Sequence, residues 1–266
     1  MTHGLAPAFE KGRPALVTYL MAGYPDRATS LASLRAAAIA GADVIELGVP
    51  YSDALADGPT IASAAHAAMQ ASADGFGLTE AIALAEEFLG DPGLDPAPPL
   101  ALMTYYNPML RAGLAHVADR AREAGVSGFI IPDLPPDEAD AWLAVSSGLD
   151  TVFLAAPTST DERLELAGRA SSGFVYCVST TGITGERAEV PAGLADLVAR
   201  VKARTALPVA VGFGISTPEQ AAAVASIADG VIVGSAVVKR QADPAQVGEF
   251  VAELAAAVRS AVDWLG

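Results

Sequence analysis

Short apolar runs and longer helical segments alternate along the whole chain. The runs are rich in β-branched residues, are bounded by Gly and Pro, and are apolar at nearly every position. Such runs are typical of strands covered on both faces in a parallel sheet, because a half-exposed strand alternates apolar and polar residues. The pattern predicts eight strands, which start at Ala15, Val44, Leu100, Gly128, Thr151, Phe174, Pro208 and Gly230.

Helical segments rich in Ala, Leu, Glu and Arg separate the predicted strands. Examples start at Arg27, His116 and Pro191. Two helices, around residues 61–69 and 78–89, are expected after the second strand, and a turn-rich connector, GDPGLDPAPP, precedes the third. Eight strand–helix units without a Ser/Gly linker predict a single domain over residues 1–266. The predicted fold is α/β, a (β/α)8 TIM barrel with extra helices rather than a doubly wound open sheet.

Composition and charge exclude several classes of partner. The formal charge is −15, and the 16 basic residues are scattered, whereas nucleic acids and anionic membranes attract clustered Lys and Arg. No segment approaches 18 uncharged apolar residues, and the start MTHGLAPAFEKGRP lacks the apolar centre of a signal peptide. We therefore expect a cytoplasmic protein that binds neither nucleic acid nor membrane. The one cysteine, Cys177, excludes a disulfide framework and is expected to be a buried, unreactive thiol.

A carboxylate interrupts the apolar run VIELGVP. Alternation along this strand places Glu46 on the face opposite Ile45 and Leu47, so Glu46 points into the barrel if those two face the helices. A structural interpretation would pair Glu46 with a buried Arg or Lys, but no predicted strand contains a basic residue. A buried unpaired carboxylate has a raised pKa, which suits a general acid or base. Because active sites of such barrels lie at the carboxyl ends of the strands, Glu46 is a candidate catalytic residue.

Three further carboxylates follow strand ends. Asp57 lies just beyond the same strand, where position alone favours a cap for the helix starting near Pro59. Asp53, in the turn YSD, is equally ambiguous. Asp133 closes the fourth strand and is either a site residue or a turn former ahead of LPP.

Glycine-rich segments follow the last three predicted strands: TTGITGE, VGFGIS and VGSAVVK. Loops after strands 7 and 8 frequently bind phosphate in TIM barrels. Side chains at Gly212, Gly214 or Gly234 would keep phosphate oxygens away from backbone N–H groups, and Ser235 adds a hydroxyl donor. Ordinary tight turns also use glycine, but three such segments in register favour a phosphate site.

Other chemistries have no support in the sequence. His66 and His116 fall in helical segments, and neither a paired-His cluster nor a Ser-His-Asp arrangement is present. No Lys lies within a predicted strand, which argues against a Schiff-base mechanism. Acid/base chemistry by carboxylates remains.

The segment ELGVPYSDALADGP resembles the signature of the tryptophan synthase alpha subunit family. The resemblance continues through LMTYYNP, STTGITGER, VGFGIS and VGSAVVK and spans essentially the whole chain. It implies a TIM barrel that cleaves indole-3-glycerol phosphate into indole and glyceraldehyde 3-phosphate without a metal or organic cofactor. It also implies an αββα complex with a beta subunit that carries pyridoxal phosphate and receives the indole.

The resemblance assigns roles to matching residues. Glu46 matches the glutamate that protonates the indole ring at C3 and takes the proton of the C3′ hydroxyl, and Asp57 matches the carboxylate that stabilises the indolenium through its N–H. Tyr176 matches a tyrosine near the glutamate, and Thr184 matches a threonine of a loop that closes onto Asp57. The implied phosphate-binding positions are Gly185, Gly212, Gly214, Gly234 and Ser235, and the implied indole-pocket positions are Tyr19, Met103, Tyr105 and Phe213. Ordinary barrel core is the alternative interpretation of these aromatic residues.

Two positions depart from the family pattern. Ala54 stands where Pro is usual, and Tyr24 replaces a common Asp, both on loops where family members meet the beta subunit. Neither removes a catalytic group, so the departures bear on coupling to the partner. Two alternatives remain at this point: a stand-alone lyase that releases free indole, and a mainly non-catalytic chain that activates a beta partner. The presence of both Glu46 and Asp57 weighs against the second.

Overall fold

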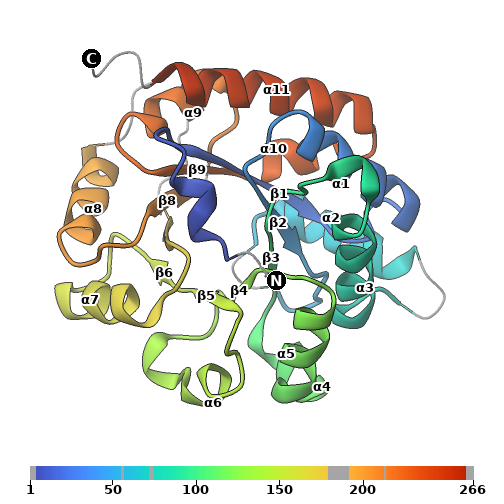
Figure 1. The fold of residues 1–266 in the computed structure, drawn as a ribbon, viewed down its shortest axis with the longest axis horizontal. Helices are drawn as coiled ribbons and strands as arrows, with labels where there is room; N and C mark the ends of the chain where they lie inside the picture. Colours follow the sequence, from blue (N-terminus) through green and yellow to red (C-terminus); the bar gives the residue numbers. More distant parts are fainter. Residues whose placement is uncertain (1–3, 55–56, 72–74, 179–191, 213, 262–266) are drawn as a thin grey trace.

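The computed structural model describes residues 4–54, 57–71, 75–178, 192–212 and 214–261. Parallel strands form a ring, and helices surround it (Figure 1). The strands are β1 (Ala15–Met21), β2 (Val44–Gly48), β3 (Leu100–Met103), β4 (Gly128–Ile130), β5 (Asp150–Val152), β6 (Leu154–Ala155), β7 (Val175–Val178), β8 (Val209–Gly212) and β9 (Gly230–Val233). The α-helices are α1 (Arg27–Ile39), α2 (Pro59–Gln70), α3 (Leu78–Leu89), α4 (Tyr106–Ala112), α5 (Leu114–Glu123), α6 (Asp140–Leu143), α7 (Asp161–Ala170), α8 (Ala192–Lys202), α9 (Pro218–Ala225), α10 (Ser235–Val238) and α11 (Pro244–Ser260). Three short 3-10 helices are η1 (Ala6–Phe9), η2 (Pro92–Leu94) and η3 (Pro136–Glu138).

The sheet has the strand order β5-β4-β3-β2-β1-β9-β8-β7-β6, and its pairs are parallel. Its two outermost strands, β5 and β6, are consecutive along the chain and are separated only by Phe153. The ring is therefore closed by one continuous segment, and the predicted TIM barrel is confirmed.

Within the described residues there are nine strands where eight were predicted, because the fifth is divided at Phe153. The Phe153 N–H donates to Ser171 Oγ at 3.1 Å rather than to a strand, while its carbonyl accepts from Tyr176 N at 3.1 Å. Residues before it pair with β4, and residues after it pair with β7. The predicted run therefore turns from one neighbour to the other within a single residue.

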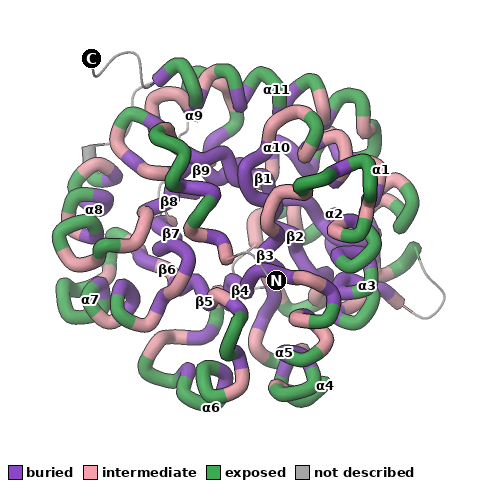
Figure 2. The backbone as a smooth tube through the Cα atoms, in the orientation of Figure 1, coloured by how far each residue is buried: buried purple, intermediate pink, exposed green. Residues whose placement is uncertain are grey.

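Side chains along each strand alternate between the barrel interior and the helix layer. Val44 packs in an interior cluster with Val17 and Ala101, whereas Ile45 and Leu47 pack in the outer cluster with the helices. Figure 2 shows buried residues along the strands and exposed ones on the outer sides of the helices. The predicted orientation of Glu46, into the barrel, is thereby confirmed.

Polar caps define where several helices begin. Asp26, Thr160 and Thr217 each accept a hydrogen bond from the backbone N–H three residues ahead, at the starts of α1, α7 and α9. Asp243 does the same for α11, with Pro244 at the first helical position. Among the described helices, none is both long and apolar enough to cross a membrane.

The amino-terminal end of the barrel is filled by the chain itself. Phe9 of η1 lies 5.2 Å from Phe174 between ring centroids, and Leu5 N donates to Asp150 Oδ2 at 2.7 Å. At the same end, the buried Asp43 carboxylate accepts hydrogen bonds from Lys11 and Arg13, each at 2.8 Å. The opposite, carboxyl end of the strands is where a substrate can enter.

Candidate active site

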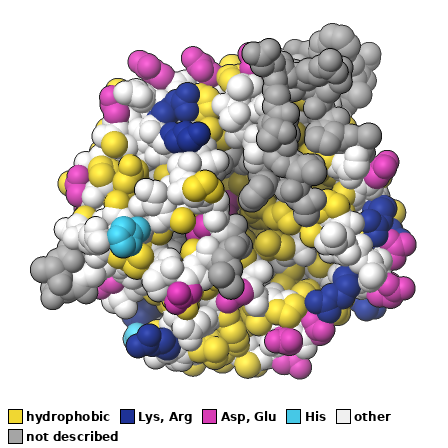
Figure 3. Space-filling model, turned by 180° about the vertical axis from the view of Figure 1, so that it is seen from behind, with side chains coloured by type: hydrophobic (Ala, Val, Ile, Leu, Met, Phe, Trp, Pro, Cys, Tyr) yellow, Lys and Arg dark blue, Asp and Glu magenta, His cyan; other side chains and the backbone are white. Residues whose placement is uncertain are grey.

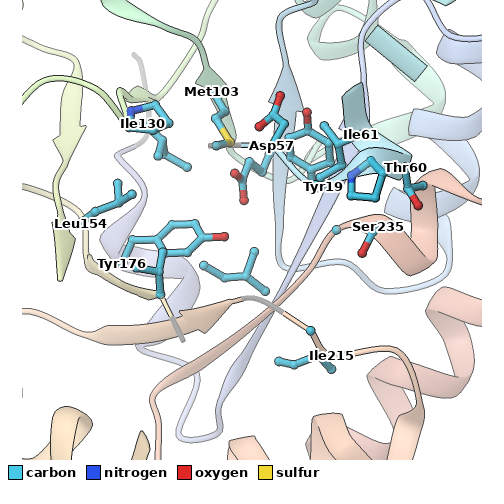
Figure 4. Close-up of a pocket in the computed structure, with 18 residues that line it drawn as sticks. Tyr19, Asp57, Thr60, Ile61, Met103, Ile130, Leu154, Tyr176, Ile215 and Ser235 are labelled. Atoms are coloured by element: carbon cyan, nitrogen blue, oxygen red, sulfur yellow. The ribbon is translucent and has the colours of Figure 1, made fainter. Parts of the chain in front are cut away.

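A cavity of about 530 Å³ lies at the carboxyl ends of the strands (Figure 4). Its wall includes the last residues of three strands, Met103, Ile130 and Val178. The predicted site residues that line it are Tyr19, Glu46, Asp57, Met103, Tyr176, Gly214, Gly234 and Ser235. Three others, Thr184, Gly185 and Phe213, fall outside the residues that the structure describes. Residues from eight of the described strands and the loops after them therefore converge on one cavity.

Glu46 is held in the middle of β2, opposite Tyr19 of β1 and Ala101 of β3 in the strand register. Its side chain is 1% exposed, and neither carboxylate oxygen has a hydrogen-bond partner among the described residues. Burial, with a smaller contribution from the charge of Asp57, raises the pKa of Glu46 to about 8. At neutral pH this carboxyl group holds its proton most of the time, yet it can release it.

Asp57 precedes α2, but the N-cap position belongs to Gly58, with Pro59 after it. The helix-capping interpretation therefore does not hold, and Asp57 lines the cavity instead. Burial raises the pKa of Asp57 to about 6, and a side-chain hydrogen bond with Tyr105 acts in the opposite direction. As the pH rises, Asp57 therefore ionises first, while Glu46 is still protonated and neutral. The charge of Asp57 then raises the pKa of Glu46, whereas the neutral Glu46 does not raise the pKa of Asp57. The two carboxyl groups are separated in function by their environments.

Two buried tyrosines flank the carboxyl groups, and each rests against a glycine at the end of the next strand. A Cβ at Gly48 would overlap the Tyr19 hydroxyl, and a Cβ at Gly212 would overlap the Tyr176 hydroxyl. Burial raises the pKa of both phenols well above their usual value, and the nearby carboxylates add to this. Both tyrosines are therefore neutral at physiological pH.

Gly212 thus has a steric reason to be glycine that the sequence did not indicate. It is covered by the Tyr176 ring and is not among the residues that line the cavity. Tyr105 does not line the cavity either. It is 6% exposed and forms a side-chain hydrogen bond with Asp57. Both residues support groups of the cavity wall from behind.

Two other predicted glycines, Gly214 and Gly234, line the part of the cavity near β8 and β9. Gly214 has φ +77°, a conformation that L side chains rarely adopt, and Gly234 is the N-cap of α10. Ser235 begins α10. Behind them, the buried Gln220 accepts from the backbone N–H of Ser216 at 2.8 Å and fixes the loop after β8. Gly214, Gly234 and the hydroxyl-bearing Ser235 all line the cavity here.

Sequence reasoning missed the apolar part of the wall. Ile61, Ile130, Leu154, Ile215 and Ile232 all line the cavity. Their positions at strand ends and at the start of α2 are the only signal that could have found them, because their residue types are those of ordinary core. The apolar wall makes the cavity suitable for an uncharged ring.

Asp133 and Asp53, whose roles the sequence left open, both lie outside the cavity lining. Asp133 is exposed and accepts from the backbone N–H of Tyr106 at 2.8 Å, so it fixes the start of α4 rather than lining the cavity. Asp53 is exposed on the loop after β2, where Ser52 Oγ donates to it at 3.2 Å.

Cys177 is buried, and burial raises the pKa of its thiol to about 12, as expected of an unreactive group. Within the described parts of the chain, no group of three His, Cys, Asp or Glu side chains is arranged to hold a metal ion.

A closed parallel barrel with two carboxyl groups of different pKa in a largely apolar cavity defines an acid/base enzyme of the TIM-barrel class. A sequence model of the tryptophan synthase alpha chain matches residues 5–262. The chain belongs to this family. The tryptophan synthase alpha chain of Dehalococcoides mccartyi is 45% identical over 255 residues, covering 94% of this chain and 97% of that protein.

Two further comparisons agree. The tryptophan synthase alpha chain of Acidothermus cellulolyticus is 46% identical over 256 residues, covering 94% of this chain and 93% of that protein. A solved structure of Mycobacterium tuberculosis tryptophan synthase matches with a TM-score of 0.87 at 43% identity, covering 97% of this chain and 99% of that chain. The similarity therefore extends over both sequence and fold.

Proposed function

We propose that this chain cleaves indole-3-glycerol phosphate into indole and glyceraldehyde 3-phosphate, with Glu46 as the group that moves the protons and Asp57 as its partner. Membership of the tryptophan synthase alpha chain family supports the reaction, a lyase step of tryptophan biosynthesis. The observation that carries the residue assignment is the Glu46 carboxyl group, which is buried at the cavity and has no hydrogen-bond partner for either oxygen among the described residues.

Glu46 has the properties that a retro-aldol cleavage requires. The indole C3 must gain a proton before the bond to the glycerol chain can break, and the C3′ hydroxyl must lose one as that bond breaks. A carboxyl group with a pKa of about 8 is mostly protonated at neutral pH, so it can give the first proton and then accept the second. Within the part of the chain that the structure describes, neither oxygen is engaged by another group, so both can bond to the substrate.

Asp57 supplies the negative charge that the reaction needs. Protonation at C3 turns the indole ring into a cation, and an ionised carboxylate at the ring N–H stabilises it. With a pKa of about 6, Asp57 is mostly ionised at neutral pH, and Tyr105 holds its side chain in place. The protonated ring then acts as the electron sink for the broken bond.

The two sides of the cavity match the two parts of the substrate. We assign the indole ring to the side with Tyr19 and Met103, and the phosphate to Gly214, Gly234 and Ser235. Thr184, Gly185 and Phe213 remain proposed site residues on the strength of the family motif. Tyr176 and Tyr105, with Gly212 behind Tyr176, support the catalytic carboxyl groups.

The proposed chemistry uses side chains of this chain alone, so we assign it no metal or organic cofactor. Pyridoxal phosphate belongs to the beta partner in this proposal. We also propose a single domain over residues 1–266, a cytoplasmic location, and an αββα assembly.

We propose that the beta partner docks on two neighbouring segments at the carboxyl end of the barrel. The loop after β2, which carries Asp53, and the start of α4 after β3 are joined by a hydrogen bond from Asn107 Nδ2 to the Tyr51 hydroxyl at 2.9 Å. The Tyr51 and Tyr105 rings are also 5.3 Å apart between centroids. Figure 3 shows the side of the barrel hidden in Figure 1, with hydrophobic side chains gathered around its centre and charged ones mostly toward its edge. A partner seated there would cover the cavity and could receive indole directly.

The decisive experiment is turnover of indole-3-glycerol phosphate by the purified chain, alone and with a tryptophan synthase beta subunit. We expect cleavage in both cases and a faster rate with the partner. Glu46→Gln and Asp57→Asn should each lower kcat by at least the roughly 10²- to 10⁴-fold typical of losing a general acid or base. Thr151→Val, at a position that bonds to Trp142 in the helix layer and does not line the cavity, is the control and should retain its rate. Near-normal turnover by Glu46→Gln would overturn the assignment, and an equal rate without the partner would favour a stand-alone lyase.

A further inference from the structure

The side chain of Gln241 is completely buried just after the short helix α10. Its Oε1 accepts from Met21 N at 2.9 Å, and its Nε2 donates to Met21 O at 2.6 Å and to Tyr24 O at 2.9 Å. The carboxamide therefore satisfies three backbone groups at the carboxyl end of β1, a segment 220 residues away in the chain. Few side-chain types could replace it, because one group must both donate and accept.

The same turn is held from the other side by α1. Ser33 Oγ donates to the backbone carbonyl of Gln241 at 2.8 Å, and Ser30 Oγ accepts from Gly23 N at 3.1 Å. The end of β1 and the turn after α10 are thus fastened to each other and to one helix. The side chains of Ser30, Ser33 and Gln241 are all buried, so water does not compete for these hydrogen bonds.

This connection joins the two sides of the cavity. α10 has only four residues, too few for a helix to hold its own position without tertiary contacts. Its first residue, Ser235, lies on the proposed phosphate side, while Tyr19, two residues before Met21, lies on the proposed ring side. Figure 4 shows Ser235 and Tyr19 on one flank of the pocket, across from Tyr176, so the proposed phosphate side and ring side are adjacent where Gln241 connects them.

We propose that Gln241 is a positioning residue that fixes the phosphate side of the cavity relative to its ring side, and so sets the length and angle of substrate that fits. The inference rests on the proposed function. Gln241 does not line the cavity and acts through α10 and β1. A loose connection would leave each side able to bind its own part of the substrate while misaligning the two.

Binding of fragments tests this proposal. Gln241→Met keeps the length of the side chain but removes its three hydrogen bonds to the backbone of Met21 and Tyr24. We expect indole and glycerol phosphate, measured separately by calorimetry, to bind the variant within about twofold of the unmodified chain. Indole-3-glycerol phosphate should bind at least ~10-fold more weakly, and kcat/KM should fall roughly 10- to 100-fold, since a misplacement of about 1 Å can cost that much. Binding of the whole substrate is measured in a Glu46→Gln background so that it is not consumed.

Thr151→Val is the matched control, because it removes a buried acceptor of the Trp142 N–H, a 3.0 Å bond in the helix layer between two residues that do not line the cavity. It should leave all three affinities unchanged. If Gln241→Met does not fold, Ser33→Ala removes one bond from the same turn and should shift the same ratio in the same direction. Equal weakening of fragments and whole substrate, or no change in either, would overturn the role of Gln241. Failure of the unmodified chain to bind any of the three ligands would instead overturn the proposed function.

Discussion

At the scale of single residues, the site depends on a carboxyl group placed where ionisation is unfavourable. Glu46 lies within a strand whose neighbours offer it neither a cation nor a hydrogen-bond donor among the described residues. A group of this kind lowers the stability of the folded chain when it must ionise. A destabilising carboxyl group at this position therefore indicates a role in catalysis rather than in folding.

Replacing Glu46 by Gln should therefore stabilise the protein, and more so at higher pH. The pKa of Glu46 is about 8 in the folded chain against 4.5 for an ordinary Glu, so between these values the unfolded chain gains free energy by ionising and the folded chain does not. Below pH 4.5 both states are protonated and the effect vanishes, while at pH 8 it approaches on the order of 4 kcal/mol. Urea unfolding of both proteins at pH 5 and pH 8 measures the difference.

The difference isolates Glu46, since Asp57 titrates in both proteins. An advantage of Glu46→Gln that is the same at both pH values would contradict a raised pKa at Glu46.

The glycines beside the two tyrosines yield a second prediction. Gly48→Ala should force the Tyr19 ring to move and should destabilise the chain by about 1 to 3 kcal/mol, as overpacking typically does. Combined with Tyr19→Ala, the same substitution should cost little, because the atoms that it overlaps are gone. A double-mutant cycle by urea unfolding measures this coupling. Gly193→Ala, at a position with nothing within 4 Å of the added Cβ, is the control. Additive effects of the two substitutions would show that the ring is not held against Gly48.

At the scale of elements, the glycine that ends β8 and the glycine that follows β9 are predicted to act differently. Gly234→Val adds a side chain at the start of α10, where a Cβ meets only ordinary contacts, so the chain should fold and lose at least ~10-fold in affinity for glycerol phosphate. Gly212→Ala should instead displace Tyr176, lowering turnover while leaving that affinity nearly unchanged. Calorimetry and a turnover assay separate the two. Loss of phosphate affinity in Gly212→Ala alone would place the phosphate at β8.

The sequence pattern predicts strands well in this chain because buried parallel strands are uniformly apolar. Every predicted run contains a strand, and the helix predicted around 78–89 is α3. The division at Phe153 could not be predicted, since it depends on Ser171, which becomes a neighbour only after the fold has formed.

The site was predictable to the extent that its residues are unusual for their position. Glu46 stands out in an apolar strand, whereas Ile61 and Leu154 have the composition of ordinary core. The contact of Gly212 with Tyr176 could not be predicted either. In the sequence, a glycine that binds phosphate cannot be told from a glycine that makes room for a tyrosine ring. Gln241 could not be found either, because its partners are more than two hundred residues away.

At the scale of the whole molecule, partner binding should act on the loop after β2. Asp53 is exposed there, four residues before Asp57, and this loop is tied to α4 through Tyr51 and Asn107. A beta subunit that holds the loop would shift Asp57 toward its productive position and raise the rate, and by linkage an active-site ligand would tighten the complex. Asp53→Ala should therefore reduce activation by the partner more than it reduces the basal rate. Turnover titrated with beta subunit measures both.

The departure at Ala54 offers the complementary change. Ala54→Pro restricts the backbone of this loop, and if flexibility limits coupling it should increase activation at a given concentration of partner. An isolated chain already at its maximal rate, with no response to the partner in any of these variants, would contradict the coupling.

The pairing of β1 with both β2 and β9 has a consequence for how the chain is made. Ala15 lies opposite Gly230, so the first strand finds its second neighbour only in the last strand to leave the ribosome. Until residue 230 has emerged, one edge of β1 and one edge of β8 expose unpaired backbone groups, which are templates for association with other nascent chains. Interrupted synthesis should therefore yield aggregates rather than smaller barrels, and completion of the last strand is the event that removes the open edges.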